Sequence, residues 1–310
     1  MIKTDLITGF LGSGKTTFIK KYAGYMLQKG FKVGILENDH GAVNVDVMLL
    51  EELEKAGCII ETIAGACDKD CHMRRFKTKL IALAMSGCDR VIIEPSGIFD
   101  IDEFFDSLRE EPLDRWYETG SVITIVDGAL EETLSPQSRY LLASQCVCAG
   151  SVLISRTQLL TTEQTKNTTD NLKDAVRELD CTVDESRIIA KSWDDLTDND
   201  MEAISRSGYV KASFVKKFGN ISGYSSLYFM NKQLSRGQAL DIAERVFTDR
   251  DCGNVFRVKG FICENGLWYQ LNAARDIYSA APIENGQDII IVIGENLNKS
   301  KISGYFGEEK

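Results

Sequence analysis

The chain has 310 residues, of which 44% are hydrophobic, and this allows one large domain or two smaller ones with buried cores. Its formal net charge of −10 and sequence pI near 4.9 argue against broad binding to nucleic acids or anionic membranes. No apolar run approaches the ~18 residues that a membrane-spanning helix needs. The sequence starts directly with a strand, so we expect no signal peptide. We therefore expect a soluble, cytoplasmic protein.

A glycine-rich loop follows the first apolar strand, which we predict within residues 3–8. Residues 9–16 read GFLGSGKT and fit the pattern GxxxxGK(S/T) at every fixed position, and a helical pattern follows. Backbone N–H groups and a helix N-terminus would surround the phosphates of a nucleoside triphosphate, Lys15 would reach the β- and γ-phosphates, and Thr16 would bind Mg²⁺. The predicted nucleotide-binding residues of this loop are Gly9, Gly12, Ser13, Gly14, Lys15, Thr16 and Thr17.

Apolar strands alternate with helical segments from residue 1 to about residue 207. Several strands are continuous β-branched runs, which is typical of strands buried on both faces of a parallel sheet. The pattern predicts an α/β domain with a doubly wound, mostly parallel sheet. The predicted strands lie at residues 6–7, 32–36, 91–94, 121–126 and 151–154, and the predicted helices follow Thr16 and span about 102–110 and 162–179.

The pattern changes after residues 208–223, which we interpret as a linker. A strand at 225–229, a helix at 235–247, strands at 255–263, 267–273 and 289–293, and a short helix from about 298 follow. We predict a domain over 1–207 and a smaller α+β domain, with a mainly antiparallel sheet, over 215–310.

Two further segments supply acids to the predicted nucleotide site. Glu94 ends an apolar strand before a small-residue turn, so it would lie near Mg²⁺, and the Gly97 N–H would contact the γ-phosphate. The polar loop 37–46 contains Asp39 and Asp46, either of which could approach Mg²⁺ or orient the attacking water. The predicted catalytic residues are Lys15, Asp46 and Glu94, and the predicted Mg²⁺ ligands are Thr16, Asp46 and Glu94.

These motifs together resemble the CobW-like P-loop GTPases, which are related to the hydrogenase and urease nickel-insertion GTPases. The resemblance rests on GFLGSGKTT at 9–17, the loop from Asn38 to Asp46, the turn 94–97, Asp127 after a hydrophobic strand, and VFRVKGF at 255–261. It implies binding of GTP or GDP, slow hydrolysis, and delivery of a metal or metal-containing cofactor to a client metalloprotein. It also implies a possible homodimer.

The base-recognition motif departs from the family pattern (N/T)KxD. The corresponding residues are Ser155, Arg156, Thr157 and Gln158. Ser155 partly replaces the polarity of asparagine, and the Arg156 stem can cover the base as lysine does. Gln158 is neutral, and a neutral hydrogen bond is weaker than a charge-assisted one, so we expect guanine preference to fall about tenfold or to be lost.

The metal-binding motif departs from the family pattern CxCC. Cys67 and Cys71 stand four residues apart, which one helical turn would place on one face, and His72 follows. His72 or His40 could replace the missing third cysteine, and such a site would suit Zn²⁺, Co²⁺ or Ni²⁺. Reduced thiols on a polar loop are the alternative, and for Cys146 and Cys148 we expect packing alone.

The leading hypothesis is therefore a GTPase that couples nucleotide hydrolysis to metal delivery. Two alternatives belong to other classes of protein. A small-molecule kinase would need a cationic lid, for which Arg74, Arg75 and Lys77 are candidates. A regulatory module would hold the nucleotide without hydrolysing it.

Overall fold

The computed structural model describes residues 1–10, 12–39, 52–64, 69–95, 101–129, 134–212, 224–274, 277–284 and 286–307. The chain divides into two compact units, Met1–Gly219 and Asn220–Lys310. Among the helices within these ranges, none combines the length and the apolar character that crossing a bilayer demands.

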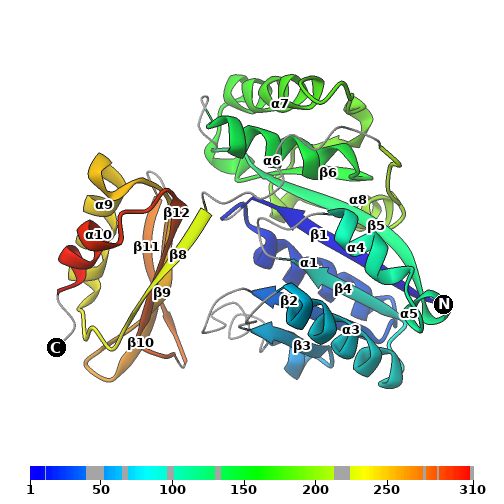
Figure 1. The fold of residues 1–310 in the computed structure, drawn as a ribbon, viewed down its shortest axis with the longest axis horizontal. Coiled ribbons are helices and arrows are strands. Elements are labelled where there is room, and N and C mark those ends of the chain that lie inside the picture. Colours follow the sequence, from blue (N-terminus) through cyan, green and yellow to red (C-terminus); the bar gives the residue numbers. More distant parts are fainter. Residues whose placement is uncertain are drawn as a thin grey trace. The chain divides into compact units, whose positions relative to one another are not determined.

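The first unit is built on a parallel seven-stranded sheet with the order β3-β2-β4-β1-β5-β6-β7 (Figure 1). Every pair of neighbouring strands runs parallel, so all the carboxyl ends meet at one edge. The strands are β1 (Ile2–Gly9), β2 (Val33–Asp39), β3 (Ile59–Ala64), β4 (Arg90–Glu94), β5 (Tyr117–Asp127), β6 (Ser151–Ser155) and β7 (Ile188–Ile189).

Helices cover both faces of this sheet, and the alternating side chains of a strand accordingly enter two different cores. Leu6 belongs to the core that includes Phe76 and Phe104, whereas Ile7 belongs to the core that includes Phe18 and Met201. The predicted doubly wound α/β fold is therefore confirmed. The helices are α1 (Lys15–Gln28), α3 (Lys69–Met85), α4 (Ile101–Leu108), α5 (Leu113–Trp116), α6 (Pro136–Val147), α7 (Thr162–Arg177) and α8 (Asp198–Ser205).

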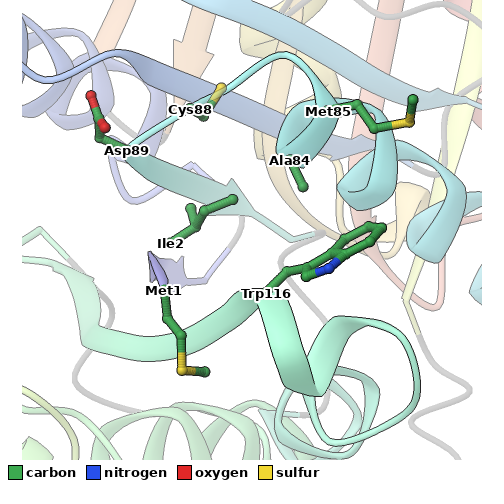
Figure 2. A pocket seen from close by; sticks show the side chains of 7 residues that line it. All are labelled: Met1, Ile2, Ala84, Met85, Cys88, Asp89 and Trp116. Carbon is green, nitrogen blue, oxygen red and sulfur yellow. The ribbon is translucent and has the colours of Figure 1, made fainter.

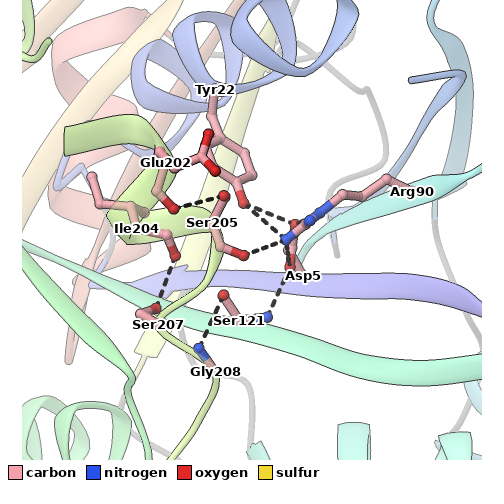
Figure 3. A network of polar contacts seen from close by, with 9 residues as sticks. All are labelled: Asp5, Tyr22, Arg90, Ser121, Glu202, Ile204, Ser205, Ser207 and Gly208. Atoms are coloured by element: carbon pink, nitrogen blue, oxygen red, sulfur yellow. Dashed lines mark hydrogen bonds and ion pairs between the residues drawn. The ribbon is translucent and has the colours of Figure 1, made fainter. Parts of the chain in front are cut away.

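A buried polar network centred on Asp5 joins the central strands of the sheet (Figure 3). Arg90 of β4 donates to the carboxylate of Asp5 on β1 at 2.5 and 2.8 Å, and a third bond reaches the Ser205 carbonyl at 2.7 Å. Asp5 also accepts from Tyr22 at 2.9 Å and from the Ser121 N–H at 2.8 Å. Burial, reinforced by Asp5, raises the pKa of Tyr22 well above its ordinary value. One carboxylate thus ties together β1, β4, β5 and α1.

The second unit is an antiparallel five-stranded sheet with the order β11-β10-β9-β12-β8. Its core joins Val258, Leu271 and Ile290 of the sheet to Ala243 of α9 and Ile302 of α10. This agrees with the predicted antiparallel α+β architecture. The elements are β8 (Tyr224–Met230), α9 (Arg236–Thr248), β9 (Asn254–Glu264), β10 (Leu267–Ala274), β11 (Ile277–Ile283), β12 (Ile289–Glu295) and α10 (Lys299–Phe306).

The predicted linker is wrong at its amino end. Residues 208–210 pack on the first unit, where the Val122 N–H donates to the Gly208 carbonyl and the Val210 N–H donates to the Cys148 carbonyl. Tyr209 also forms an isolated antiparallel bridge with Ala149. The close approach depends on Gly150, because a Cβ there would lie 2.2 Å from the Gly208 carbonyl oxygen.

Candidate functional site

The loop between β1 and α1 has the backbone conformation that a phosphate site requires. Gly9, Gly12 and Gly14 have positive φ angles of 145°, 84° and 96°. A Cβ on Gly9 would lie 2.2 Å from the Ile125 carbonyl oxygen, so only glycine fits there without a shift of the backbone. The Ser13 N–H donates to the Phe10 carbonyl at 3.2 Å and closes the turn.

The N-terminal turn of α1 contains neither an acidic residue nor a capping side chain of its own. Its N-cap is Gly14. Lys15 is buried, and its Nζ donates to the carbonyls of Gly9 at 3.1 Å and Phe10 at 3.3 Å. The Ser13 hydroxyl is also buried and has no hydrogen-bond partner within the described residues. A helix N-terminus, a cation and an unpaired donor on one short loop suit a phosphate group.

Two carboxylates lie beside the loop on neighbouring strands. Thr16 Oγ1 lies 3.5 Å from Glu94 Oε1, which brings together two of the three predicted Mg²⁺ ligands. Glu37 of β2 is the register partner of Glu94, and both residues are buried. A hydroxyl and carboxylates are the oxygen ligands that Mg²⁺ prefers, so these residues fit the ion. We did not predict a role for Glu37, although, like Glu94, it lies at the carboxyl end of an apolar strand.

Ser155 and Arg156, which we predicted to bind the nucleotide, lie on the other side of the loop. The Arg156 guanidinium donates to the Gly12 carbonyl at 2.9 Å and to Asp127 at 2.6 Å. The Ser155 hydroxyl is buried without a hydrogen-bond partner in the described part of the chain. Gln158 is exposed on the short helix η1 (Thr157–Leu159). Arg156 therefore connects the phosphate loop to the segment predicted to bind the base.

The predicted transition-metal site is described only in part. Cys67 and His40 lie outside the described residues, as do Asp46 and Gly97. Cys71 is half-buried on α3, which also contains His72. Within the described ranges, no group of three or more His, Cys, Asp or Glu residues could hold a metal ion.

The described cysteines are free thiols, and most of them are buried. Cys146 and Cys148 pack in the core, which confirms the expectation for this pair. Burial raises the pKa of Cys58 to about 11 and raises the pKa of Cys146 further. These thiols stay protonated near neutral pH and are poor metal ligands.

A pocket of about 460 Å³ is lined by Ile2 and Asp89, at the amino ends of β1 and β4, and therefore lies away from the phosphate loop. Figure 2 shows the residues that line it. Met1, Met85 and Trp116 are among the residues that line it. Neither Lys15 nor Glu94 reaches this pocket, so the phosphate chemistry is separate from it.

The sequence has recognisable relatives in its first unit. Residues 3–183 match the family described as "CobW/HypB/UreG, nucleotide-binding domain". The zinc chaperone YeiR of Escherichia coli (strain K12) is 29% identical over 164 residues, which cover 53% of this chain and 49% of YeiR. The zinc chaperone YjiA of the same strain is 28% identical over 169 residues, which cover 51% of this chain and 50% of YjiA. The chain therefore spans about half the length of these curated relatives.

The zinc chaperone CobW of Sinorhizobium sp is 30% identical over 136 residues, which cover 41% of this chain and 37% of that protein. Among solved structures, Zn(II)-bound YjiA GTPase from E. coli aligns over 98% of both chains at 17% identity, with a TM-score of 0.38. The family match extends over more than half of the sequence, from β1 beyond α7, and includes the phosphate loop, Glu94 and Arg156. This chain belongs to the CobW/HypB/UreG family.

Proposed function

We propose that this protein binds and hydrolyses GTP with Mg²⁺ and uses the cycle to deliver a transition metal, zinc foremost, to a client metalloprotein. The observation that carries the proposal is the loop from Gly9 to Thr16, with its positive-φ glycines, its uncapped α1 and its contact with Glu94. The names of the relatives as zinc chaperones support the choice of cargo. The cytoplasm is the proposed compartment, because its reducing conditions keep free cysteines as thiols.

The proposed hydrolysis depends on positioning and electrostatics rather than on a covalent intermediate. Lys15 and the N-terminal turn of α1 would bind the phosphates. Thr16, Glu94 and Asp46 would hold Mg²⁺, and we add Glu37 as a further ligand. Mg²⁺, when bound, would neutralise charge that develops on the phosphate oxygens. Asp46 and Gly97 remain the proposed partners of the attacking water and the γ-phosphate.

The proposed cargo site consists of Cys67 and Cys71 with His72 or His40. Its position in the sequence, between the strand β3 and the acid Glu94, would let the state of the nucleotide alter its geometry. Nucleotide binding would then change metal affinity, and the thermodynamic coupling must be reciprocal.

One experiment tests the proposal in two steps. Phosphate release from GTP and from ATP is measured first, and we expect turnover that requires Mg²⁺ and leaves no phosphorylated acceptor. Zinc affinity is then measured with GDP and with a non-hydrolysable GTP analogue bound. Equal zinc affinity in the two states would rule out the coupling, and absence of phosphate release would favour the regulatory module.

The residues that we considered as a cationic kinase lid do not support the kinase alternative. Lys77 pairs with Glu110, and Arg74 is exposed on α3. We therefore retain the GTPase as the proposed activity.

A further inference from the structure

The indole of Trp193 lies beside the phosphate loop. Trp193 is the first residue of the short helix η3 (Trp193–Asp195), in the segment that follows β7. Its Nε1 lies 3.7 Å from the point that a Cβ on Gly14 would occupy, and its ring centroid lies 5.3 Å from that of Phe18 on α1. Lys21 of α1 also donates a hydrogen bond to the Trp193 carbonyl. These contacts hold the indole against the first turns of α1.

The strand order gives the two sides of the phosphate loop different chemistry. Glu94 ends β4 on one side of β1, whereas Ser155 ends β6 on the other side and Trp193 follows β7. The carboxylate side suits Mg²⁺ and the terminal phosphate. A triphosphate that extends its γ-phosphate toward Glu94 therefore directs its nucleoside toward Ser155 and Trp193.

The nucleoside side offers an aromatic surface and the Ser155 hydroxyl, and its charged Arg156 is already paired with Asp127. The buried Ser155 hydroxyl lies 3.9 Å from the same Cβ position that Trp193 approaches. Trp193 is half-buried: it packs against the core that includes Phe18 and keeps part of its surface exposed. Gln158 is neutral, whereas the family pattern (N/T)KxD has an aspartate at this position. Recognition of the base must then depend more on packing than on a charge-assisted hydrogen bond.

We propose that Trp193 packs against the base of the bound nucleotide and is the principal base-binding side chain of this site. The proposal rests on the proposed function, since it requires a nucleotide on the phosphate loop. Aromatic stacking tolerates any base, because every base has a π-face. The site should therefore discriminate only weakly between GTP and other purine triphosphates.

The decisive measurement compares GTP with inorganic tripolyphosphate, which has the phosphates but no nucleoside. We expect Trp193→Ala to weaken GTP binding about tenfold, within the range that one base–aromatic stack supplies, and to leave tripolyphosphate binding unchanged. Trp193→Phe should retain most of the affinity for GTP. Trp116→Phe, at the pocket away from the phosphate loop, is the matched control and should change neither affinity.

Three outcomes would overturn the role of Trp193. If Trp193→Ala weakened the binding of both ligands equally, the contribution of Trp193 would be purely structural. If GTP affinity were unchanged, Trp193 would contribute nothing to nucleotide binding. Equal binding of GTP and tripolyphosphate to the wild type would show that no side chain holds the base, while phosphate binding itself stands. If the wild type binds neither ligand, the proposed function fails instead.

Fluorescence gives an answer even if Trp193→Ala does not fold. The chain has three tryptophans, so the double variant Trp116→Phe/Trp268→Phe leaves Trp193 as the only emitter. We expect saturating GDP to change its emission and to protect it from acrylamide quenching. Unaltered emission and unaltered quenching at saturating GDP would contradict contact between the indole and the base.

Discussion

Lys15 is a buried cation whose Nζ contacts two carbonyl oxygens of its own loop. A phosphate oxygen is a stronger acceptor than a neutral carbonyl, because the bond is then charged at both ends. The carbonyl groups of the loop thus stabilise the ammonium group, and a bound phosphate would replace these carbonyl contacts. This arrangement makes Lys15 the side chain whose charge matters most to the proposed chemistry.

Replacing Lys15 with methionine should keep the aliphatic stem and remove the charge. We expect the rate of GTP hydrolysis to fall by about 100-fold, the usual cost of losing one group that stabilises transition-state charge. Single-turnover phosphate release measures this rate. Lys20→Met on the same helix is the control, since its exposed pair with Glu52 contributes little. Equal losses in the two variants would contradict a specific role for Lys15.

Glu37 and Glu94 place two buried carboxylates next to each other, and a divalent cation would relieve their repulsion. Glu37→Gln should therefore raise the Mg²⁺ concentration needed for half-maximal hydrolysis. The measurement is a Mg²⁺ titration of the initial rate. Glu61→Gln on β3 removes a carboxylate that pairs with Lys79 and should leave the titration unchanged. An unaltered Mg²⁺ requirement in Glu37→Gln would show that Glu37 is not a ligand.

At the scale of elements, α8 joins the segment that contains Trp193 to the core. Met201 and Ile204 pack against α1, and Tyr25 donates to Glu202 at 2.6 Å. Thr197 caps the helix, and its own N–H donates to the Asp200 carboxylate at 2.9 Å. This capping box sets the start of α8 directly after η3.

The pH dependence of stability should include a contribution from Asp200. Its bond to Lys191, assisted by Thr197, lowers its pKa from 3.8 to about 2. Because the folded pKa lies below the unfolded one, this contribution is present above about pH 4 and is lost as the pH falls toward 2. Asp200→Asn should lower Tm at pH 7, and its difference from wild type should narrow on acidification. A difference that is constant between pH 7 and pH 2.5 would contradict this assignment.

The strands that we predicted from the sequence are mainly those buried on both faces. β4 and β6 are continuous apolar runs, and their burial is complete. The missed strands are short or lie at sheet edges, where sequence patterns are weak. β3 contains Glu61 and Thr62, β7 has two residues, and β11 contains Ser279 and Pro282. Edge strands tolerate polar residues and proline because one side lacks a partner strand.

In the candidate site, too, the features set by a local sequence pattern could be predicted, and those set by tertiary structure could not. Gly9 to Thr16 could be predicted because one contiguous pattern specifies both conformation and chemistry. The approach of Trp193 to Gly14 could not, because these residues are 179 positions apart and meet only through the order of strands β1, β6 and β7. No local pattern marks a tryptophan in a polar loop as part of a phosphate site.

At the scale of the whole molecule, the phosphate loop, Glu94, Arg156 and Trp193 all belong to the first unit. Residues 1–219 expressed alone should therefore bind GTP with the same Kd as the full chain, as measured by calorimetry. The cores of the two units are also made of different residues, so we expect the shorter chain to unfold cooperatively. A folded fragment without affinity for GTP would show that the second unit contributes to the site.

The pairing of Asp5 with Arg90 has a kinetic consequence for the carboxyl ends of their strands. Arg90, the first residue of β4, is fastened to Asp5 in the middle of β1, and the same two strands carry Gly9 and Glu94 at their carboxyl ends. The spacing between the phosphate loop and this acid is thus set by short, paired strands before any ligand arrives. Association of Mg²⁺ and nucleotide then needs no rearrangement of this part of the sheet. We expect the on-rate to be governed by diffusion and by the release of water from Mg²⁺.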